Sequence, residues 1–401
     1  MNPIVMKFGG SSVENIEKMQ AIAQKIQQKK TDGFDVVVVV SAMGKTTNQL
    51  LELARQASTN PSKREIDLLI STGEQVSISL LSMILNENGQ SAIGLTGFQA
   101  GIKTSGLHTK NKIEDIDIEK VEKHLRDGKI VVVAGFQGLN QDGDITTLGR
   151  GGSDTTAVAL GAKLNCRVEI YTDVEGIYGV DPRLYPKAKK IDVISYEEMK
   201  EMAFLGAKVM EPRSIEIGHR FAVEILVASA HQNTPGTIIK EFDPSMETKS
   251  ITGLSLSERV ILVSVNHLPS QSRHTADLFI KLAQNEINVD MISQTHTPDG
   301  FVNLAFTASS EDTHLINDVL TDLHKKYDDV IISTDTNIVK ISVVGMAMRT
   351  QSGVAATLFE LFAANDIDYK LITTSEISIS YTIDNALKEK AVHLIASAFN
   401  L

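Results

Sequence analysis

The sequence predicts an α/β sandwich with a mostly parallel sheet over residues 1–240, followed by two βαββαβ units. Three observations predict this arrangement. Apolar β-branched runs alternate with helical patterns in the first part, turn-forming residues gather near residues 240–250, and the last third contains an internal repeat. A chain of 401 residues is long enough for two or three domains.

The strands of the first part are continuous apolar runs rather than alternating ones. Such runs indicate parallel strands covered on both faces, and the clearest is the valine run at residues 36–40. The expected strands cover residues 3–6, 36–40, 130–134, 168–172 and 223–227. The expected helices cover residues 13–28, 65–86, 118–127, 155–164 and 197–202. Strands that alternate with helices are typical of a sandwich with helices on both faces of the sheet.

The last third repeats itself. Residues 285–293 and 365–373 align position by position at a period of about 80 residues. In the first copy we expect strands at 260–265, 289–295, 301–308 and 330–333, with helices at 275–285 and 313–327; in the second, strands at 339–344, 369–374 and 377–383, with helices at 354–364 and 387–399. The second copy lacks a last strand, and an orphan strand at 251–257 precedes the first.

We expect the orphan strand to cross over and complete the sheet of the second copy. The predicted domains are therefore residues 1–240, residues 258–334, and residues 251–257 together with 335–401. The first copy is then an insertion inside the second.

Composition excludes several classes of protein. The net charge is -11 and no block of like charges occurs, which disfavours nucleic acid as a partner. Lys7 interrupts the only early apolar run, and no run of 18 apolar residues exists, so we expect neither a signal peptide nor a membrane span. The single cysteine, Cys166, rules out an internal disulfide and favours a reducing compartment. The histidines lack metal-binding spacing, so no metal-ligating residues are assigned.

A glycine turn follows the first expected strand, and this is the first candidate site. Lys7 precedes the pair Gly9-Gly10, whose backbone N–H groups can approach an anion closely. Ser11 and Glu14 have the spacing of a capping box, which predicts that a helix begins there and points its N-terminus at the anion. Neither G-x-x-x-x-G-K-[ST] nor G-x-G-x-x-G occurs. A phosphate site and an ordinary tight turn both fit these residues.

A second glycine nest surrounds Arg150. The segment 149–156 reads GRGGSDTT and opens another expected helix. Arg150 can clamp a carboxylate through two hydrogen bonds, and Asp154 can hold an ammonium group, so together they form a natural receptor for an amino-acid zwitterion. The alternative is a plain helix start, with Asp154 as its cap and Arg150 in solvent.

A third polar segment follows the strand at 168–172. Residues 172–183 contain an aromatic ring and several charges, and a nucleotide base and ribose could lie there. An ordinary surface loop explains the same residues. Because ligands of open α/β sheets bind at the carboxyl ends of the strands, the three segments are expected at one edge of the sheet.

These three segments, in this order, resemble the amino-acid kinase superfamily and, within it, the aspartokinase family. The resemblance rests on residues 7–13, 149–154 and 172–183, extends over essentially the whole chain, and makes the C-terminal repeat similar to tandem ACT domains. It implies an amino-acid-kinase-like αβα sandwich followed by two ferredoxin-like ACT domains. It also implies ATP-dependent phosphorylation of the aspartate side chain, feedback regulation by lysine or threonine, and a cytoplasmic homo-oligomer that assembles through its ACT domains.

The resemblance also implies roles for individual residues. Lys7, Arg150 and Asp154 would be the catalytic residues. The implied aspartate-binding residues are Ser41, Thr47, Glu74, Arg150, Ser153 and Asp154. The implied ATP-binding residues are Lys7, Gly9, Gly10, Ser11, Thr172, Asp173, Tyr178, Asp181, Arg183, Lys208, Val209 and Met210. The expected effector contacts are Asp290, Ser293, Gln294, Ser375 and Glu376.

The expected chemistry needs no general base, because a carboxylate with a pKa near ~4 is already ionised at neutral pH. Catalysis then reduces to alignment and charge stabilisation, with Mg²⁺ held mainly by ATP phosphates and water. Two other interpretations remain open. One is a sister carboxylate kinase that acts on glutamate or acetylglutamate, and the other is a catalytically inactive amino-acid sensor. One departure from the ACT pattern is that residues 268–274, in the first loop of the first copy, contain no glycine.

Overall fold

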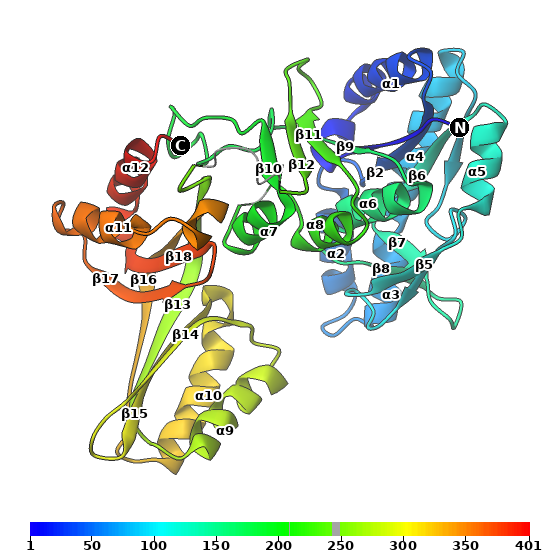
Figure 1. Cartoon of the computed structure of the whole chain (residues 1–401). Helices are drawn as coiled ribbons and strands as arrows, with labels where there is room; N and C mark the ends of the chain where they lie inside the picture. Colours follow the sequence, from blue (N-terminus) through cyan, green and yellow to red (C-terminus); the bar gives the residue numbers. More distant parts are fainter. Residues whose placement is uncertain (208, 243–248) are drawn as a thin grey trace. The chain divides into compact units, whose positions relative to one another are not determined.

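The computed structural model describes residues 1–207, 209–242 and 249–401 (Figure 1). The chain forms two compact units. The first comprises Met1–Ile177, Lys190–Ala203 and Lys208–Ser245, and the second comprises Tyr178–Lys189, Phe204–Ala207 and Met246–Leu401. The sequence placed residues 178–189 in the first domain, but this segment groups with the second unit because Val180 is buried in that unit's hydrophobic core.

The first unit is built on an eight-stranded sheet. In spatial order its strands are β10 (Val193–Ser195), β12 (Thr237–Lys240), β11 (Ile225–Ser229), β9 (Val168–Thr172), β1 (Pro3–Phe8), β2 (Asp35–Val40), β6 (Ile130–Ala134) and β3 (Ala92–Leu95). Every neighbouring pair is parallel except β11 and β12. The valines of β2 are fully buried between helices, which confirms the prediction of a mostly parallel sheet covered on both faces.

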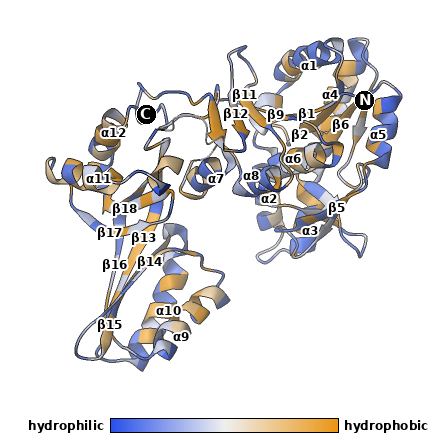
Figure 2. Cartoon of the chain, viewed as in Figure 1, coloured by the Kyte–Doolittle hydropathy of each residue, from blue (hydrophilic) through white to orange (hydrophobic). Residues whose placement is uncertain are grey.

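Helices cover both faces of this sheet. The helices of the first unit, among the residues that the structure describes, are α1 (Ile16–Thr31), α2 (Thr46–Ala57), α3 (Lys63–Ile70), α4 (Thr72–Glu87), α5 (Glu119–Arg126), α6 (Gly152–Leu164), α7 (Tyr196–Phe204) and α8 (Pro212–Arg220). Helices α1 and α4 share one apolar core with the sheet, and α6 packs on β1, β2 and β9. Figure 2 shows apolar residues concentrated on the strands and polar residues on outer helices such as α5.

The expected helix at 65–86 is in fact two helices, α3 and α4, which meet at Ser71. Within the described residues, the stretch Lys63–Glu87 is long and apolar enough to cross a membrane by composition, and half of its most apolar window is buried. Helix α4 packs against α1, β3 and β6, so its apolar residues serve the core.

The first helix begins later than the capping box predicted, so that prediction was wrong. Residues Gly10–Val13 form a 3₁₀ turn with no side-chain cap, and Glu14 pairs with Lys18 instead. Helix α1 starts at Ile16, where the side chain of Asn15 accepts a hydrogen bond from the backbone N–H of Lys18. An asparagine cap satisfies one of the free N–H groups of the first turn, so it outcompetes the Ser11–Glu14 pair.

A small four-stranded sheet adjoins the main one and was not expected from the sequence. Its strands, in spatial order, are β5 (Lys112–Ile116), β4 (Ile102–Ser105), β7 (Gln137–Leu139) and β8 (Ile145–Thr147). Helix α3 packs against β8. The small sheet matters because the chain leaves β8 directly into the Arg150 loop.

The second unit contains one six-stranded antiparallel sheet. Its strands, in spatial order, are β14 (Val289–His296), β15 (Phe301–Ser309), β13 (Gly253–Pro269), β16 (Ile331–Val344), β18 (Ser378–Asp384) and β17 (Tyr369–Thr374). Its helices are α9 (Ser272–Gln284), α10 (Thr313–Lys326), α11 (Val354–Ala363) and α12 (Lys388–Ala398). Residues 253–257 of β13 pair with residues 340–344 of β16, whereas residues 260–269 pair with β15. One long strand therefore serves both repeats, and their division into two domains remains a prediction.

Candidate active site

Lys7 is the next-to-last residue of β1 and therefore lies at the carboxyl edge of the main sheet, just before the glycine turn. Strand β1 lies between β2 and β9, and the backbone N–H of Gly9 donates to the carbonyl of Tyr171 at 3.4 Å. A Cβ on Gly10 would lie 2.8 Å from the carbonyl oxygen of Ala42. The close approach of these two strand ends therefore requires glycine at position 10.

The loop before α6 brings Arg150 to the same edge. Gly149 and Gly151 have φ values of 80° and 67°, a region that glycine adopts without strain. Gly151 is the N-cap of α6, and no side-chain hydrogen bond caps this helix, so the alternative of a plain helix start capped by Asp154 is not what the structure shows. The side chain of Arg150 is exposed. The helix N-terminus and Arg150 both favour an anion here.

An ion pair connects the two loops. The Nζ of Lys7 lies 2.5 Å from Oδ1 of Asp154. Both side chains are almost buried, so the attraction is screened little by solvent. Lys7 and Asp154 therefore hold β1 and α6 in a fixed relation.

Both loops line one cleft of about 270 Å³. Its lining residues are Lys7, Gly10, Ser41, Ala42, Gly44, Thr47, Glu74, Phe136, Gly149, Arg150, Gly151, Gly152, Ser153 and Asp154. The structure thus brings together all six residues that the sequence proposed for aspartate binding. The sequence missed Ala42, Gly44 and Phe136, although the first two follow β2 and Phe136 follows β6, so the rule of strand carboxyl ends could have found them.

Glu74 is the most perturbed group in the cleft. Its residue is 3% exposed, and burial raises the pKa of the Glu74 carboxyl to about 8. The backbone N–H of Ala42 donates to Oε1 at 3.1 Å, while Oε2 has no hydrogen-bond partner among the described residues. A buried carboxyl oxygen without a partner is a place where a ligand donor can bind.

The expected nucleotide residues are divided between the two units. Thr172 ends β9, and its hydroxyl donates to Asp173 at 3.0 Å. Tyr178, Asp181 and Arg183 belong to the second unit. Arg183 donates to Asp181 from Nη2 at 2.6 Å, so each of these two charges is already paired.

The remaining nucleotide residues follow α7 in the first unit. Met210 is buried and Val209 is half-buried. Lys208, which the sequence proposed as a phosphate contact, lies outside the described residues.

The expected effector residues lie on two elements of the second unit. Asp290, on β14, forms an ion pair with the buried side chain of Lys340. Ser293 and Gln294 follow on the same strand. Ser375 lies in the turn between β17 and β18, where its hydroxyl contacts that of Ser378 at 2.8 Å.

Glu376, in the same turn, pairs with Arg349 at 3.2 Å.

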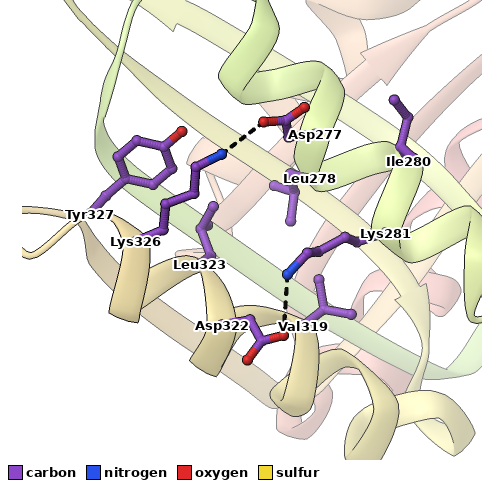
Figure 3. A pocket seen from close by; sticks show the side chains of 9 residues that line it. All are labelled: Asp277, Leu278, Ile280, Lys281, Val319, Asp322, Leu323, Lys326 and Tyr327. Carbon is purple, nitrogen blue, oxygen red and sulfur yellow. Dashed lines mark hydrogen bonds and ion pairs between the residues drawn. The ribbon is translucent and has the colours of Figure 1, made fainter.

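A separate cavity of about 170 Å³ lies between α9 and α10, lined by apolar side chains and crossed by two ion pairs (Figure 3). Lys326 meets Asp277 at 2.8 Å, and Lys281 meets Asp322 at 3.1 Å. The four charges that line this cavity are thus paired with each other.

No cluster of three or more His, Cys, Asp or Glu side chains that could hold a metal ion occurs among residues 1–207, 209–242 and 249–401. Cys166 is half-buried, and burial raises the pKa of its thiol to about 12. A thiol of this kind is protonated at neutral pH and unreactive.

Comparison with known proteins agrees with this geometry. Residues 2–229 match the amino acid kinase family, and residues 341–399 match an ACT domain. The aspartokinase of Bacillus sp. (strain MGA3) is 45% identical over 100% of this chain and 98% of its own length, and aspartokinase 2 of Bacillus subtilis (strain 168) is 43% identical with the same coverage.

Solved structures lead to the same family. The structure of E. coli aspartokinase III in complex with aspartate and ADP superposes with a TM-score of 0.83 at 25% identity, covering 99% of both chains. The structure of the same enzyme with lysine and aspartate has a TM-score of 0.80 at 25% identity, again covering 99% of both chains. This chain therefore belongs to the amino acid kinase family and, within it, to the aspartokinases, ACT-containing allosteric enzymes that use a nucleotide to phosphorylate aspartate.

Proposed function

We propose that the enzyme transfers the terminal phosphoryl group of ATP to the side-chain carboxylate of L-aspartate, giving 4-phospho-L-aspartate and ADP. The observation that supports this proposal is that Lys7 and Arg150 line one cleft, in which Lys7 also pairs with Asp154. A cation suited to a phosphoryl group and a cation suited to a carboxylate therefore border the same cleft, which supports the proposal.

In this proposal the zwitterion of aspartate is held at its α-carbon end. Arg150 pairs with the α-carboxylate, and the N-terminus of α6 with Ser153 adds hydrogen-bond donors. Glu74 receives the ammonium group at its unpartnered oxygen. Ser41 and Thr47, which also line the cleft, face the substrate.

The reacting end of the substrate then points toward Lys7. The side-chain carboxylate is already ionised, so the enzyme has to align it and stabilise charge rather than remove a proton. Lys7 stabilises the transferring phosphoryl group, with phosphate oxygens against Gly9 and on the N–H groups of Gly10 and Ser11, since the N–H of Gly9 itself donates to Tyr171. Asp154 holds the Lys7 ammonium in place through their 2.5 Å contact.

The nucleotide is proposed to lie beyond this turn. Its proposed contacts are Thr172, Asp173, Tyr178, Asp181, Arg183, Lys208, Val209 and Met210. The carboxylates lining the cleft are Asp154, which is paired with Lys7, and Glu74, which is buried. A Mg²⁺ ion that accompanies ATP is therefore proposed to be held by phosphate oxygens and water, where it would neutralise phosphate charge.

Regulation is proposed to follow from the second unit. The enzyme would catalyse the first step toward lysine, threonine and methionine, with lysine, threonine or both as the inhibiting effector. The T-state structure of E. coli aspartokinase III, a complex with lysine and aspartate, supports lysine as one candidate. We also propose that the chain forms a homo-oligomer through its ACT domains and acts in the cytoplasm.

The decisive experiment traps the acyl phosphate with hydroxylamine. Purified enzyme with ATP and Mg²⁺ is supplied with aspartate, glutamate or acetylglutamate in parallel. We expect a hydroxamate from aspartate alone. A hydroxamate from glutamate or acetylglutamate instead of aspartate would show that the substrate is not aspartate. The absence of a hydroxamate from all three compounds would favour a catalytically inactive amino-acid sensor.

A further inference from the structure

Asp67, on α3, is a carboxylate outside the cleft lining and is completely buried. Removing a carboxylate from water costs several kcal/mol unless hydrogen bonds replace its hydration. A buried carboxylate is therefore tolerated only where its hydrogen-bond partners replace the lost hydration. The partners of Asp67 therefore indicate what it does.

The two oxygens of Asp67 receive donors from two other segments. Thr147 donates its hydroxyl to Oδ1 at 2.5 Å. The backbone N–H of Thr109 donates to both oxygens, at 3.1 and 3.0 Å, and Nδ1 of His108 lies 2.7 Å from Oδ2. Thr109 has a φ of 70°, a left-handed conformation that is unfavourable for a β-branched residue. Asp67 thus fixes a backbone that would not adopt this shape unaided.

Both segments border the loop that carries Arg150. Thr147 is the last residue of β8, and its carbonyl accepts from the backbone N–H of Asn111 at 3.0 Å. The carbonyl oxygen of Thr109 lies 3.1 Å from the place where a Cβ on Gly149 would be. The Arg150 loop therefore leaves from one anchored residue and packs against another.

The loop itself has little intrinsic rigidity. Gly149 and Gly151 flank Arg150, and both take positive φ values. Glycine restricts the backbone less than any other residue, so the position of Arg150 depends on how firmly the ends of the loop are held. In a site where a displacement of about 1 Å can cost about a hundredfold in rate, the anchor becomes part of substrate recognition.

We propose that Asp67 is a positioning residue for the aspartate site: by holding Thr109 and Thr147 it fixes the loop that presents Arg150 to the substrate. This inference rests on the proposed pairing of Arg150 with the α-carboxylate. Asp67 acts through the loop and touches neither substrate nor nucleotide.

Two neighbouring threonines provide a matched test. Thr147 donates to Asp67, whereas Thr146, next to it on β8, shares a buried hydrogen bond of 2.5 Å with Thr104. Thr147→Val and Thr146→Val each delete one fully buried hydroxyl with little change in shape. We expect Thr147→Val to raise KM for aspartate about tenfold, with KM for ATP within about twofold of the parent. Thr146→Val should leave KM for aspartate and KM for ATP unchanged. Its loss of stability in urea should be similar to that of Thr147→Val.

Asp67→Asn supplies a second variant that keeps a carbonyl acceptor for Thr109 and Thr147. We expect its KM for aspartate to rise by less than that of Asp67→Ala. If Asp67→Ala does not fold, Thr147→Val and Asp67→Asn decide the question. Equal KM values in Thr147→Val and Thr146→Val, or an unchanged KM in Thr147→Val, would overturn the proposal.

The double variant Arg150→Ala/Thr147→Val separates this inference from the proposed function. Because Asp67 and Thr147 act through Arg150, the double variant should have the KM of Arg150→Ala alone. A normal KM for aspartate in Arg150→Ala would refute the proposed pairing of Arg150 with the α-carboxylate, and this inference would fail with it. A raised KM in Arg150→Ala, with independent and additive effects of Thr147→Val, would leave the clamp intact and reject only the positioning role.

Discussion

Lys7 at the carboxyl end of β1 and Asp154 in the first turn of α6 form an ion pair of 2.5 Å, with side chains only 11% and 12% exposed. Because so little water screens the pair, breaking it by removing one partner leaves an uncompensated charge. The pair therefore fixes the distance between the glycine turn behind Lys7 and the loop of Arg150. The single cleft depends on this contact.

The first prediction concerns Lys7→Ala. We expect kcat to fall at least about a hundredfold, because the cation that stabilises the transferring phosphoryl group is gone. The fold should persist with lower stability, since Asp154 is left buried without its partner. Steady-state kinetics and urea unfolding measure the two effects.

The double variant Lys7→Ala/Asp154→Asn is the control for the unpaired charge. It should regain much of the stability without regaining kcat. Near-normal turnover in Lys7→Ala would overturn the assignment of Lys7.

A second prediction concerns Arg150→Ala. KM for aspartate should rise by about tenfold or more while kcat changes less, because the α-carboxylate loses a charged partner in the ground state as well as in the transition state. Arg150→Lys should be intermediate, since an ammonium cannot form the paired hydrogen bonds of a guanidinium. Arg126→Ala, on the outer helix α5, serves as a control for loss of an exposed arginine. An unchanged KM in Arg150→Ala would contradict the clamp.

The raised pKa of Glu74, about 8, predicts how aspartate binding depends on pH. A substrate ammonium binds the ionised carboxyl, so the affinity for aspartate should increase as pH rises toward about 8 and then level off. Glu74→Gln should bind weakly and lose this dependence. Calorimetric titrations at pH 6, 7 and 8 in buffers of different ionisation heat would reveal the proton released on binding. A Kd that is independent of pH in the parent enzyme would refute the role of Glu74.

The same carboxyl has the opposite effect on the stability of the free enzyme. Its pKa is raised in the folded chain, so between about pH 4.5 and 8 the folded state binds more protons than the unfolded state. The contribution of Glu74 to the free energy of unfolding is therefore largest below pH 4.5 and is lost as pH rises through 8. Urea unfolding across this range should show a smaller decline for Glu74→Gln than for the parent.

The sequence predicted the parts of the fold that depend on burial. A short continuous run of β-branched residues such as 36–40 indicates a covered strand, and the loops at the carboxyl ends of parallel strands share one edge of the sheet. The shared position of the glycine turn after β1 and the Arg150 loop was therefore predictable from the order of strands and loops, whereas Ser41, Thr47 and Glu74 were named only from the family resemblance. The small sheet was not predictable, because its strands have only three to five residues and two of them, Ile102–Ser105 and Lys112–Ile116, carry charges.

Asp67 was equally hidden from sequence reasoning. It lies in a short helix beside other charged residues, and only the packing of α3 against β8 reveals that its carboxylate is buried. The division of residues 172–183 between two units was also unpredictable, because adjacency in sequence suggested a single loop. Local patterns describe which residues are buried but not which distant segments they hold.

The start of α1 gives a prediction about helix capping. Asn15→Ala should lower the free energy of unfolding by about 1 kcal/mol, because one N–H of the first turn loses its acceptor. Glu14→Ala should change stability little, since Glu14 pairs with Lys18 on the surface and does not cap the helix. Urea denaturation of the two variants compares them directly. A larger loss of stability for Glu14→Ala than for Asn15→Ala would show that Glu14, rather than Asn15, caps the first turn of α1.

The last prediction concerns Asp290 and Lys340 in the second unit. The side chain of Lys340 is only 4% exposed and its ammonium pairs with Asp290. An effector ammonium that used Asp290 would therefore have to displace Lys340. If Asp290 is an effector contact, Lys340→Met should bind lysine or threonine about tenfold more tightly, because the competing internal cation is gone. Asp290→Ala should abolish binding and lower the Tm, since it leaves Lys340 buried without a partner.

The combined variant Asp290→Ala/Lys340→Met distinguishes recognition from folding. It removes both charges together, so its Tm should recover toward that of the parent while effector binding stays absent. Calorimetry with each amino acid, in the presence and absence of an ATP analogue, measures both the affinity and its coupling to the nucleotide. If Asp290→Ala/Lys340→Met still bound the effector with the affinity of the parent, Asp290 would have no part in recognition, and the effector would have to bind at other residues.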